Sequence, residues 1–399
     1  MNFVFISPNF PRTYWNFCDR LKNNGANVLG VGDCPYDELD ENLKRSLSEY
    51  YKVSSLENYD EVFRAVAFFS FKYGKIDWVE SNNEYWLEQD ARLRTDFNIT
   101  TGNKSDDIGK FKSKSAMKAF YREAGVPSAR NHRIEGREDA LLFAHEVSYP
   151  VIVKPDVGVG AADTYKLSSD EDLDWFFSVK PPVKYVIEDF IEGDIYSYDA
   201  ITNEKCEPLF ESSTVFPPSI ADIVNNGYDL SYYVTDKVPK KLRELGRATL
   251  KSFGVRSRFV HFEFFRLTKP HKGLGDTGDF VGLEVNMRPA GGYTPDMMNF
   301  AHSTDVYAIW ADSVAYGERR TEAAEDDCFC VYSSRRDGIR YVHSHEDVID
   351  RYGEHIVMCE RMPDALSDAM GNQMYTAKCR TLDETKEFIR FVSERADGV

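Results

Sequence analysis

Polar side chains interrupt two apolar stretches of this sequence at spacings that suit metal binding. In GDFVGLEVNMRPAGGY (278–293), Glu284 and Asn286 stand two residues apart within a run that predicts a strand. Side chains alternate between the faces of a strand, so this pair shares one face. Glu263, in HFEFF (261–265), belongs to a second such run. If the two strands are neighbours, three oxygen donors converge, which suits Mg²⁺ or Mn²⁺. A solvated strand face that pairs its glutamates with lysine or arginine is the alternative.

The end of the same stretch carries a cation and a pair of glycines. Arg288 follows the predicted strand, and Gly291 and Gly292 come three and four residues later. A guanidinium can hold a carboxylate or phosphate through two parallel hydrogen bonds. Adjacent glycines permit a tight backbone turn. We therefore expect an anionic substrate group to lie at this strand end, beside Arg288.

The stretch VIVKPDVGVGAADTY (151–165) has the residues of a phosphate-binding loop. Lys154 ends an apolar run, and a loop of small residues follows it. Small residues let backbone N–H groups approach phosphate oxygens, and the lysine adds a point charge. In a P-loop the lysine follows the glycines, whereas here it precedes them. The order predicts a hairpin-type flap over phosphates, with a plain β-hairpin as the alternative.

Taken together, these motifs resemble those of the ATP-grasp superfamily over about residues 1–320. The segment 114–130, KSAMKAFYREAGVPSAR, is similar to the family's Lys-x-x-Met-Lys helix, and 185–194, YVIEDFIEGD, looks like its adenine-binding hinge. The resemblance implies ATP and a metal held by Glu263, Glu284 and Asn286. It implies nucleotide contacts at Lys114, Lys154, Gly158, Gly160, Ala161, Glu188, Asp189, Phe190, Ile191 and Asp194.

Two stretches point to one branch of that superfamily. EVNMRPAGGY and ESNNE (80–84) are similar to motifs of carboxylate–amine ligases of the L-amino-acid ligase kind. The resemblance implies that a carboxylate attacks the γ-phosphate of ATP to form an acylphosphate, which an amine then converts to an amide. The expected catalytic residues are Lys154, Glu284 and Arg288, and the expected substrate-binding residues are Glu84, Arg288, Gly291 and Gly292.

The sequence departs from the family pattern in one place and leaves two other functions open. Many members have a ribose-binding glutamate where this chain has Ile195, so either Asp194 or another residue would contact the ribose. The strand end also lacks the N-x-R-x-Q-V-E-H pattern of biotin carboxylases. The alternatives are a non-catalytic ATP-binding sensor or scaffold, and a ligase of the purine-pathway type.

The elements that must position these residues are predicted by hydrophobic periodicity. The first hundred residues alternate strand-like runs with amphipathic helices, which predicts a doubly wound parallel sheet. The turn after the first strand, SPNFPRT (7–13), is not G-x-G-x-x-G, which argues against NAD or FAD. We expect an α/β protein that is α+β in its catalytic part. Its predicted parts are a Rossmann-like domain (1–108), a mobile lid (109–186), a catalytic antiparallel sheet (187–320) and a small C-terminal α+β domain (321–399).

The composition of the chain disfavours some classes of binding partner. The chain has 399 residues and a net charge of −17, which disfavours binding to nucleic acid or anionic membranes. The N-terminal residues do not resemble a signal peptide, and no apolar run is long enough to span a membrane. The seven cysteines are scattered, as expected for reduced thiols. We expect a cytoplasmic enzyme that acts on a small carboxylate and a small amine, and that forms a homodimer.

Overall fold

The computed structural model describes residues 1–158, 163–216, 229–322 and 326–396. Its N-terminal sheet has four parallel strands in the order β3-β2-β1-β4. This confirms the predicted parallel sheet. The strands are β1 (Asn2–Ile6), β2 (Asn27–Gly32), β3 (Glu49–Lys52) and β4 (Trp78–Glu80), and the accompanying helices are η1 (Arg12–Tyr14), α1 (Trp15–Asn23), η2 (Tyr36–Glu38), α2 (Glu41–Ser46), α3 (Tyr59–Tyr73), α4 (Leu87–Asp96) and η3 (Ser105–Asp107).

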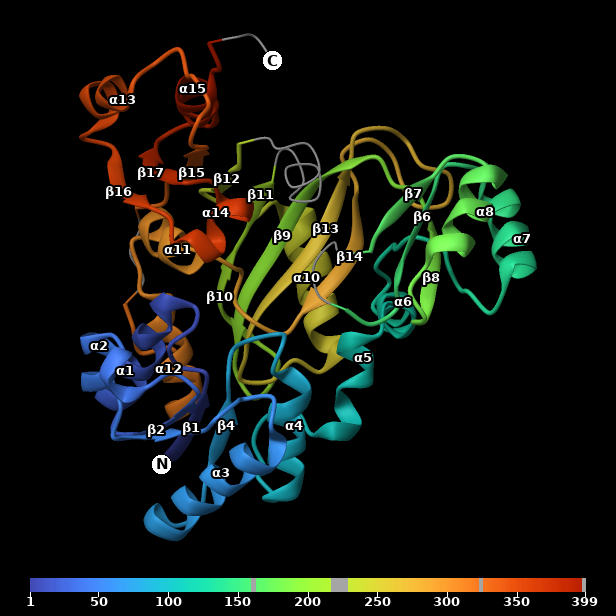
Figure 1. The fold of residues 1–399 in the computed structure, drawn as a ribbon. Coiled ribbons are helices and arrows are strands. Elements are labelled where there is room, and N and C mark those ends of the chain that lie inside the picture. Colours follow the sequence, from blue (N-terminus) through green and yellow to red (C-terminus); the bar gives the residue numbers. More distant parts are fainter. Residues whose placement is uncertain (159–162, 217–228, 323–325, 397–399) are drawn as a thin grey trace.

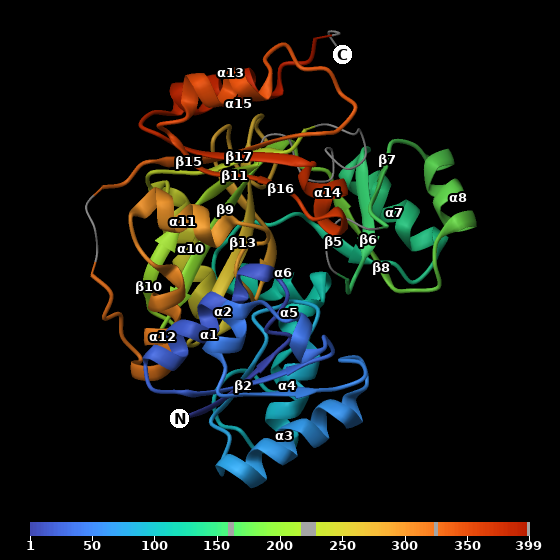
Figure 2. The same cartoon turned by 60° about the vertical axis from the view of Figure 1, so that its left-hand side comes forward.

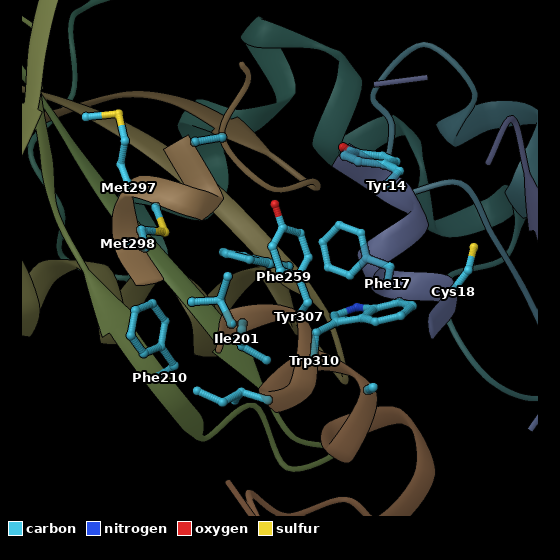
Figure 3. Packing of buried hydrophobic residues seen from close by; sticks show 14 of the residues in the cluster. Tyr14, Phe17, Cys18, Ile201, Phe210, Phe259, Met297, Met298, Tyr307 and Trp310 are labelled. Carbon is cyan, nitrogen blue, oxygen red and sulfur yellow. The ribbon is translucent and has the colours of Figure 1, made fainter. Parts of the chain in front are cut away.

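Both faces of this sheet are covered, which explains why β1 is apolar throughout. Phe3 and Phe5 belong to a core shared with α1 and with a later helix, α12 (Val306–Tyr316). Val4 and Ile6 lie in a separate core with α3. Figure 3 shows the first core from close by, with Phe17 of α1 packed against Trp310 of α12. A parallel sheet buried on both faces requires such continuous hydrophobic runs.

The strand order places a switch point between β1 and β4. The chain runs outward from β1 to β3 and then returns to the other side of β1. In open α/β sheets, ligands bind beyond the carboxyl ends of the strands at such a point. The turn after β1 and the turn after β4 meet there, because the Tyr14 hydroxyl donates a hydrogen bond to the Asn82 carbonyl at 2.7 Å.

A second sheet lies mostly within the range predicted as a lid (109–186), at the right of Figure 1, and we call residues 109–189 the lid. Its strand order is β5-β8-β6-β7, and its helices α7 and α8 pack over a core of its own. Helices α5 and α6 lead into it from the N-terminal sheet. The elements are α5 (Gly109–Lys112), α6 (Lys114–Glu123), β5 (Asn131–Arg133), α7 (Arg137–Val147), β6 (Val151–Pro155), β7 (Tyr165–Leu167), α8 (Asp170–Val179) and β8 (Tyr185–Asp189).

The third sheet is antiparallel where it carries the candidate metal ligands. Its order is β14-β13-β9-β11-β12-β15-β17-β16, with β10 paired to β9. Helix α10 packs on β9, and α11 and α12 follow β14 in the chain. The elements are β9 (Gly193–Thr202), β10 (Pro208–Ser212), β11 (Thr214–Phe216), β12 (Ser231–Val234), α10 (Lys240–Phe253), β13 (Phe259–Leu267), β14 (Phe280–Asn286) and α11 (Thr294–His302).

The C-terminal strands extend this third sheet, as both views show. Strand β15 pairs with β12 over four residue positions, so residues 321–399 share a sheet with 187–320. The division into four parts stays a prediction. The C-terminal elements are β15 (Phe329–Arg335), α13 (His345–Tyr352), β16 (Ile356–Arg361), α14 (Asp364–Met370), β17 (Gln373–Cys379) and α15 (Leu382–Ser393). Within the described ranges, no helix combines the length and apolar character needed to cross a membrane.

Candidate active site

Strands β13 and β14 bring the predicted metal ligands together. Their antiparallel register places Glu263 directly opposite Glu284, and Asn286 opposite His261. Directly opposite side chains lie on one face of a sheet, and so do side chains two residues apart. In the described part of the chain, no three His, Cys, Asp or Glu side chains are placed to hold a metal. Mg²⁺ needs only one or two carboxylates when phosphates and water complete its shell, so two glutamates with one amide oxygen fit it.

Lys114 lies beside this pair of strands. Its ammonium is 3.1 Å from Glu284 Oε1 and donates to the Gly158 carbonyl at 3.2 Å. The lysine occupies the first turn of α6, which Ser113 caps by accepting a hydrogen bond from the Ala116 N–H. The start of α6 therefore connects β14 with Gly158 of the Gly-rich loop, the last residue described before 159–162. Of that loop, Gly160 and Ala161 lie outside the described residues.

A buried carboxylate stands between two lysines in the lid. Glu188 Oε2 is 2.7 Å from Lys154 Nζ, and Glu188 Oε1 is 3.0 Å from Lys118 Nζ. Burial alone would raise the pKa of Glu188, but the two ammonium groups lower it to about 2. Glu188, predicted as an adenine contact, is thus engaged by cations in this structure. Sequence analysis did not select Lys118, although it is the second lysine of the Lys-x-x-Met-Lys motif.

The predicted hinge follows Glu188 directly. Asp189 accepts a hydrogen bond from Arg130 Nε at 3.0 Å, and Lys166 Nζ lies 4.0 Å from the centre of the Phe190 ring. Ile191 is buried against neighbouring apolar side chains. Asp194 is exposed at the start of β9. The nucleotide-binding roles of these four residues stay predictions.

A histidine lies between Asp199 and Glu263, one of the predicted metal ligands. His261 Nδ1 is 2.7 Å from Asp199 Oδ1, and its Nε2 is 3.3 Å from Glu263 Oε1. Burial would lower the pKa of His261, but Asp199 and Glu263 raise it to about 9. Ser197 donates a hydrogen bond to the other oxygen of Asp199. The H-x-E spacing in HFEFF was the available signal for this arrangement, and sequence analysis did not use it.

The strand ends of the first and third sheets are joined by a buried ion-pair cluster. Arg258 Nη1 and Nη2 lie 2.5 and 3.0 Å from the Glu80 carboxylate, and Arg94 Nη2 lies 2.7 Å from it. Burial would raise the pKa of Glu80, but the two arginines lower it. Arg258 Nε also donates to the Met287 carbonyl at 2.6 Å. This cluster fixes the turn after β4 against the end of β14.

The predicted substrate-binding residues lie at this junction. Glu84 Oε2 accepts a hydrogen bond from the Met287 N–H at 3.1 Å, and burial raises the pKa of Glu84. Arg288 follows Met287 directly, and its Nη1 donates a hydrogen bond to the Pro289 carbonyl at 2.8 Å. Gly292 has a φ of +62°, a conformation that favours glycine. The neighbouring Gly291 has no such conformation.

The arrangement can neutralise and align phosphate groups. Lys114 and Lys154 approach the carboxylate-bearing face from the lid side, whereas Arg288 stands at the strand end beside the switch point. Each of these three cations already contacts a carboxylate or a backbone carbonyl. A bound anion would replace those contacts. A separate hollow of about 250 Å³ lies elsewhere, between β10 and α10, and includes none of the predicted site residues.

Comparison with known sequences gives distant partial matches. No family model matches the chain. A carbamoyl phosphate synthase large chain from Bifidobacterium adolescentis is 25% identical over 47% of this chain and 17% of its own length. An L-arginine-specific L-amino acid ligase from Bacillus subtilis is 24% identical over 55% of this chain. The chain aligns with about half of that ligase and less than a fifth of the synthase.

Comparison with solved structures matches nearly the whole chain. Phosphoribosylglycinamide synthetase from Anaerococcus prevotii has a TM-score of 0.68 at 14% identity, over 98% of this chain and 97% of its own. L-amino acid ligase from Bacillus licheniformis has a TM-score of 0.68 at 13% identity, over 98% and 96%. N5-carboxyaminoimidazole ribonucleotide synthetase from Thermotoga maritima has a TM-score of 0.64 at 14% identity, over 97% and 96%. These matches confirm the fold class predicted from the sequence.

Proposed function

We propose that this chain, which has the ATP-grasp fold, is an ATP-dependent carboxylate–amine ligase that forms an amide between two small molecules. The observation that carries the proposal is the meeting of Glu263, Glu284 and Asn286 with Lys114 on one side of the third sheet. Two carboxylates and an amide would hold Mg²⁺, and the lysine would hold phosphate oxygens. Bound Mg²⁺ would supply charge neutralisation for the triphosphate.

The remaining residues fit the two steps of such a ligation. Arg288 would hold the substrate carboxylate, so that it can approach the γ-phosphate despite its own charge. The carboxylate oxygen bonds to phosphorus as ADP leaves, which gives an acylphosphate. The amine then bonds to the acyl carbon as phosphate leaves, and the ammonium proton is lost. Lys154 and the loop after it would cover the phosphates and keep water from the acylphosphate.

The substrate class belongs to the proposal as well. Two of the similar proteins are named as L-amino acid ligases, one of them specific for L-arginine, which supports an amino-acid substrate. Phosphoribosylglycinamide synthetase matches the fold equally well, so a purine-pathway-type ligase is the second candidate. A homodimer in the cytoplasm remains part of the prediction.

A substrate panel with two site variants tests the proposal. ADP and phosphate release would be measured over pairs of amino acids, with mass spectrometry of the products. We expect Lys154→Ala and Glu284→Ala each to lower turnover by about 10²-fold or more, the scale for removing one electrostatic stabiliser. Lys205→Ala and Glu204→Ala, in the exposed turn between β9 and β10, are the matched controls. Turnover near wild type in both site variants would contradict the site. If no pair of amino acids leads to ADP release, a non-catalytic sensor or scaffold would be favoured.

A further inference from the structure

A hollow of about 250 Å³ lies at the edge of the third sheet that faces away from the lid (Figure 1). Strand β10 forms one wall, and among the described strands β10 pairs only with β9. The other walls are the first turn of α10 with the segment before it, the end of α11, and the segment that follows α12. We call this space the β10 hollow. None of the residues predicted to bind nucleotide, metal or substrate lines it.

Two of the three carboxylates that line the β10 hollow are already bound by side chains. Glu211 accepts hydrogen bonds from the Tyr198 hydroxyl at 2.7 Å and from Arg247 Nε at 2.8 Å. Asp327 Oδ1 lies 2.9 Å from a ring nitrogen of a histidine at the end of α11. The third carboxylate, Asp236, forms no hydrogen bond or ion pair with any described residue. One carboxylate of the hollow is therefore without a partner.

Arg319, which also lines the hollow, is held in place by neutral acceptors alone. Its Nε donates a hydrogen bond to the Thr321 carbonyl at 2.8 Å. Its Nη2 donates to the Glu322 carbonyl at 3.0 Å and to the Thr304 hydroxyl at 3.1 Å. Arg319 forms no ion pair within the described ranges. Burial lowers its pKa, and the charge of Asp312 offsets this only in part. The guanidinium is therefore oriented while its charge has no close carboxylate.

Arg243 and Lys237 add two further positive charges to the hollow. Arg243 Nε is buried and donates no hydrogen bond to any described residue, and its contact with Glu211 Oε2 is long, at 3.7 Å. Lys237 is exposed and forms no ion pair in the part of the chain that the structure describes. Three cations without a close carboxylate thus line the same hollow as one carboxylate without a cation. In a protein with a net charge of −17, this local excess of positive charge favours an anion.

We propose that the β10 hollow binds a small organic anion, a carboxylate or a phosphate ester with a short carbon body. Guanidinium groups bind the oxygens of either anion through paired, charge-assisted hydrogen bonds. Leu209, Phe210 and Val238 line the same hollow, and their apolar side chains would pack against the carbon atoms of the ligand. Sites for drug-sized ligands span about 300–1,000 Å³, so this hollow suits a smaller molecule. The proposal does not depend on the ligase function.

Isothermal titration calorimetry at constant ionic strength tests the proposal. The probes are succinate and glycerol 3-phosphate, compared with the uncharged 1,4-butanediol and glycerol. We expect at least one of the anions to bind and neither of the uncharged molecules to do so. Arg243→Gln and Arg319→Gln should each weaken anion binding by about tenfold or more, the scale for losing a hydrogen bond between charged groups. Arg256→Gln removes the same charge from an exposed position outside the hollow and should leave the affinity unchanged.

Three results would overturn the proposal. The first is that neither anion binds to the wild type at millimolar concentrations. The second is an unchanged affinity in an Arg243→Gln or Arg319→Gln protein that melts like the wild type. The third is that Arg288→Gln abolishes the binding, because the anion would then occupy the proposed active site. If Arg319→Gln does not fold, Lys237→Gln takes its place, since Lys237 is exposed and supports no other contact.

Discussion

At the residue scale, the buried carboxylates Glu80 and Glu188 are each held by two cations, whereas the buried Asp90 is held by a serine. Its Oδ2 accepts hydrogen bonds from Ser81 N and Ser81 Oγ at 2.9 and 2.6 Å, whereas its Oδ1 has no partner among the described residues. Burial raises the pKa of Asp90 to about 7, and the charge of Glu80 acts in the same direction. The ionised form of this aspartate is therefore disfavoured in the folded protein.

Replacing Asp90 should change how stability depends on pH. The unfolded aspartate has a pKa near ~3.9, so the folded state binds the extra proton between pH of about 4 and 7. Wild-type stability falls as pH rises through this window and then levels off. We expect Asp90→Asn, which does not titrate, to gain on the order of 2–3 kcal/mol relative to wild type between pH 5 and pH 8. Urea unfolding at the two pH values measures this, with the exposed Asp106→Asn as control. A stability difference between Asp90→Asn and the wild type that is the same at both pH values would contradict the raised pKa of Asp90.

At the element scale, β4 and β14 belong to different sheets and are joined by Arg258. The guanidinium connects the Glu80 carboxylate, at the end of β4, to the Met287 carbonyl, just after β14. The Glu84 carboxylate makes a second connection, because it accepts a hydrogen bond from the Met287 N–H. The turn that carries the predicted substrate residue is thus fixed relative to the strand that carries the predicted metal ligands.

Removing this connection should destabilise the whole chain. We expect Arg258→Met to lower the free energy of unfolding by about 3–5 kcal/mol, because Glu80 would stay buried with one cation in place of two. Arg256→Met, two residues earlier and exposed, should change it by less than about 0.5 kcal/mol. Denaturant unfolding of both variants compares them. A loss below about 1 kcal/mol for Arg258→Met would mean that Arg94 alone satisfies Glu80.

The same junction shows how far sequence reasoning reached. Apolar, β-branched and aromatic runs predicted the strands of the first sheet, and the two-residue spacing of Glu284 and Asn286 predicted their common face. Val285 and Met287 are buried on the other face, as that alternation requires. The ion pair of Glu80 with Arg258 could not be predicted from the sequence, because the two residues are 178 positions apart and no local pattern pairs distant charges. The pairing of Glu188 with two lysines was missed for the same reason.

At the scale of the whole molecule, one hydrophobic core joins several parts of the chain, whereas another is confined to the lid. One core contains side chains of β1, α1, β12, α12, β15 and β17, so it joins the N-terminal sheet, the third sheet and the C-terminal strands. Among its described residues, the lid has a core of nine buried side chains from α7, α8 and its own strands, none of which belongs to the large core. The lid sheet, with α7 and α8, meets the rest of the chain at a small apolar cluster around Ile191. Helices α5 and α6, which lead into it, instead pack into a core with α10 and β13.

This division has a consequence for the way the protein melts. Parts that share one core lose it together, whereas a part with its own core can unfold while the rest stays native. We expect differential scanning calorimetry to record two heat-absorption peaks, a smaller one for the lid sheet with α7 and α8 and a larger one for everything else. Protease cleavage between the two peaks should fall within residues 125–190. One peak with equal calorimetric and van't Hoff enthalpies would instead mean that the lid has no thermal independence.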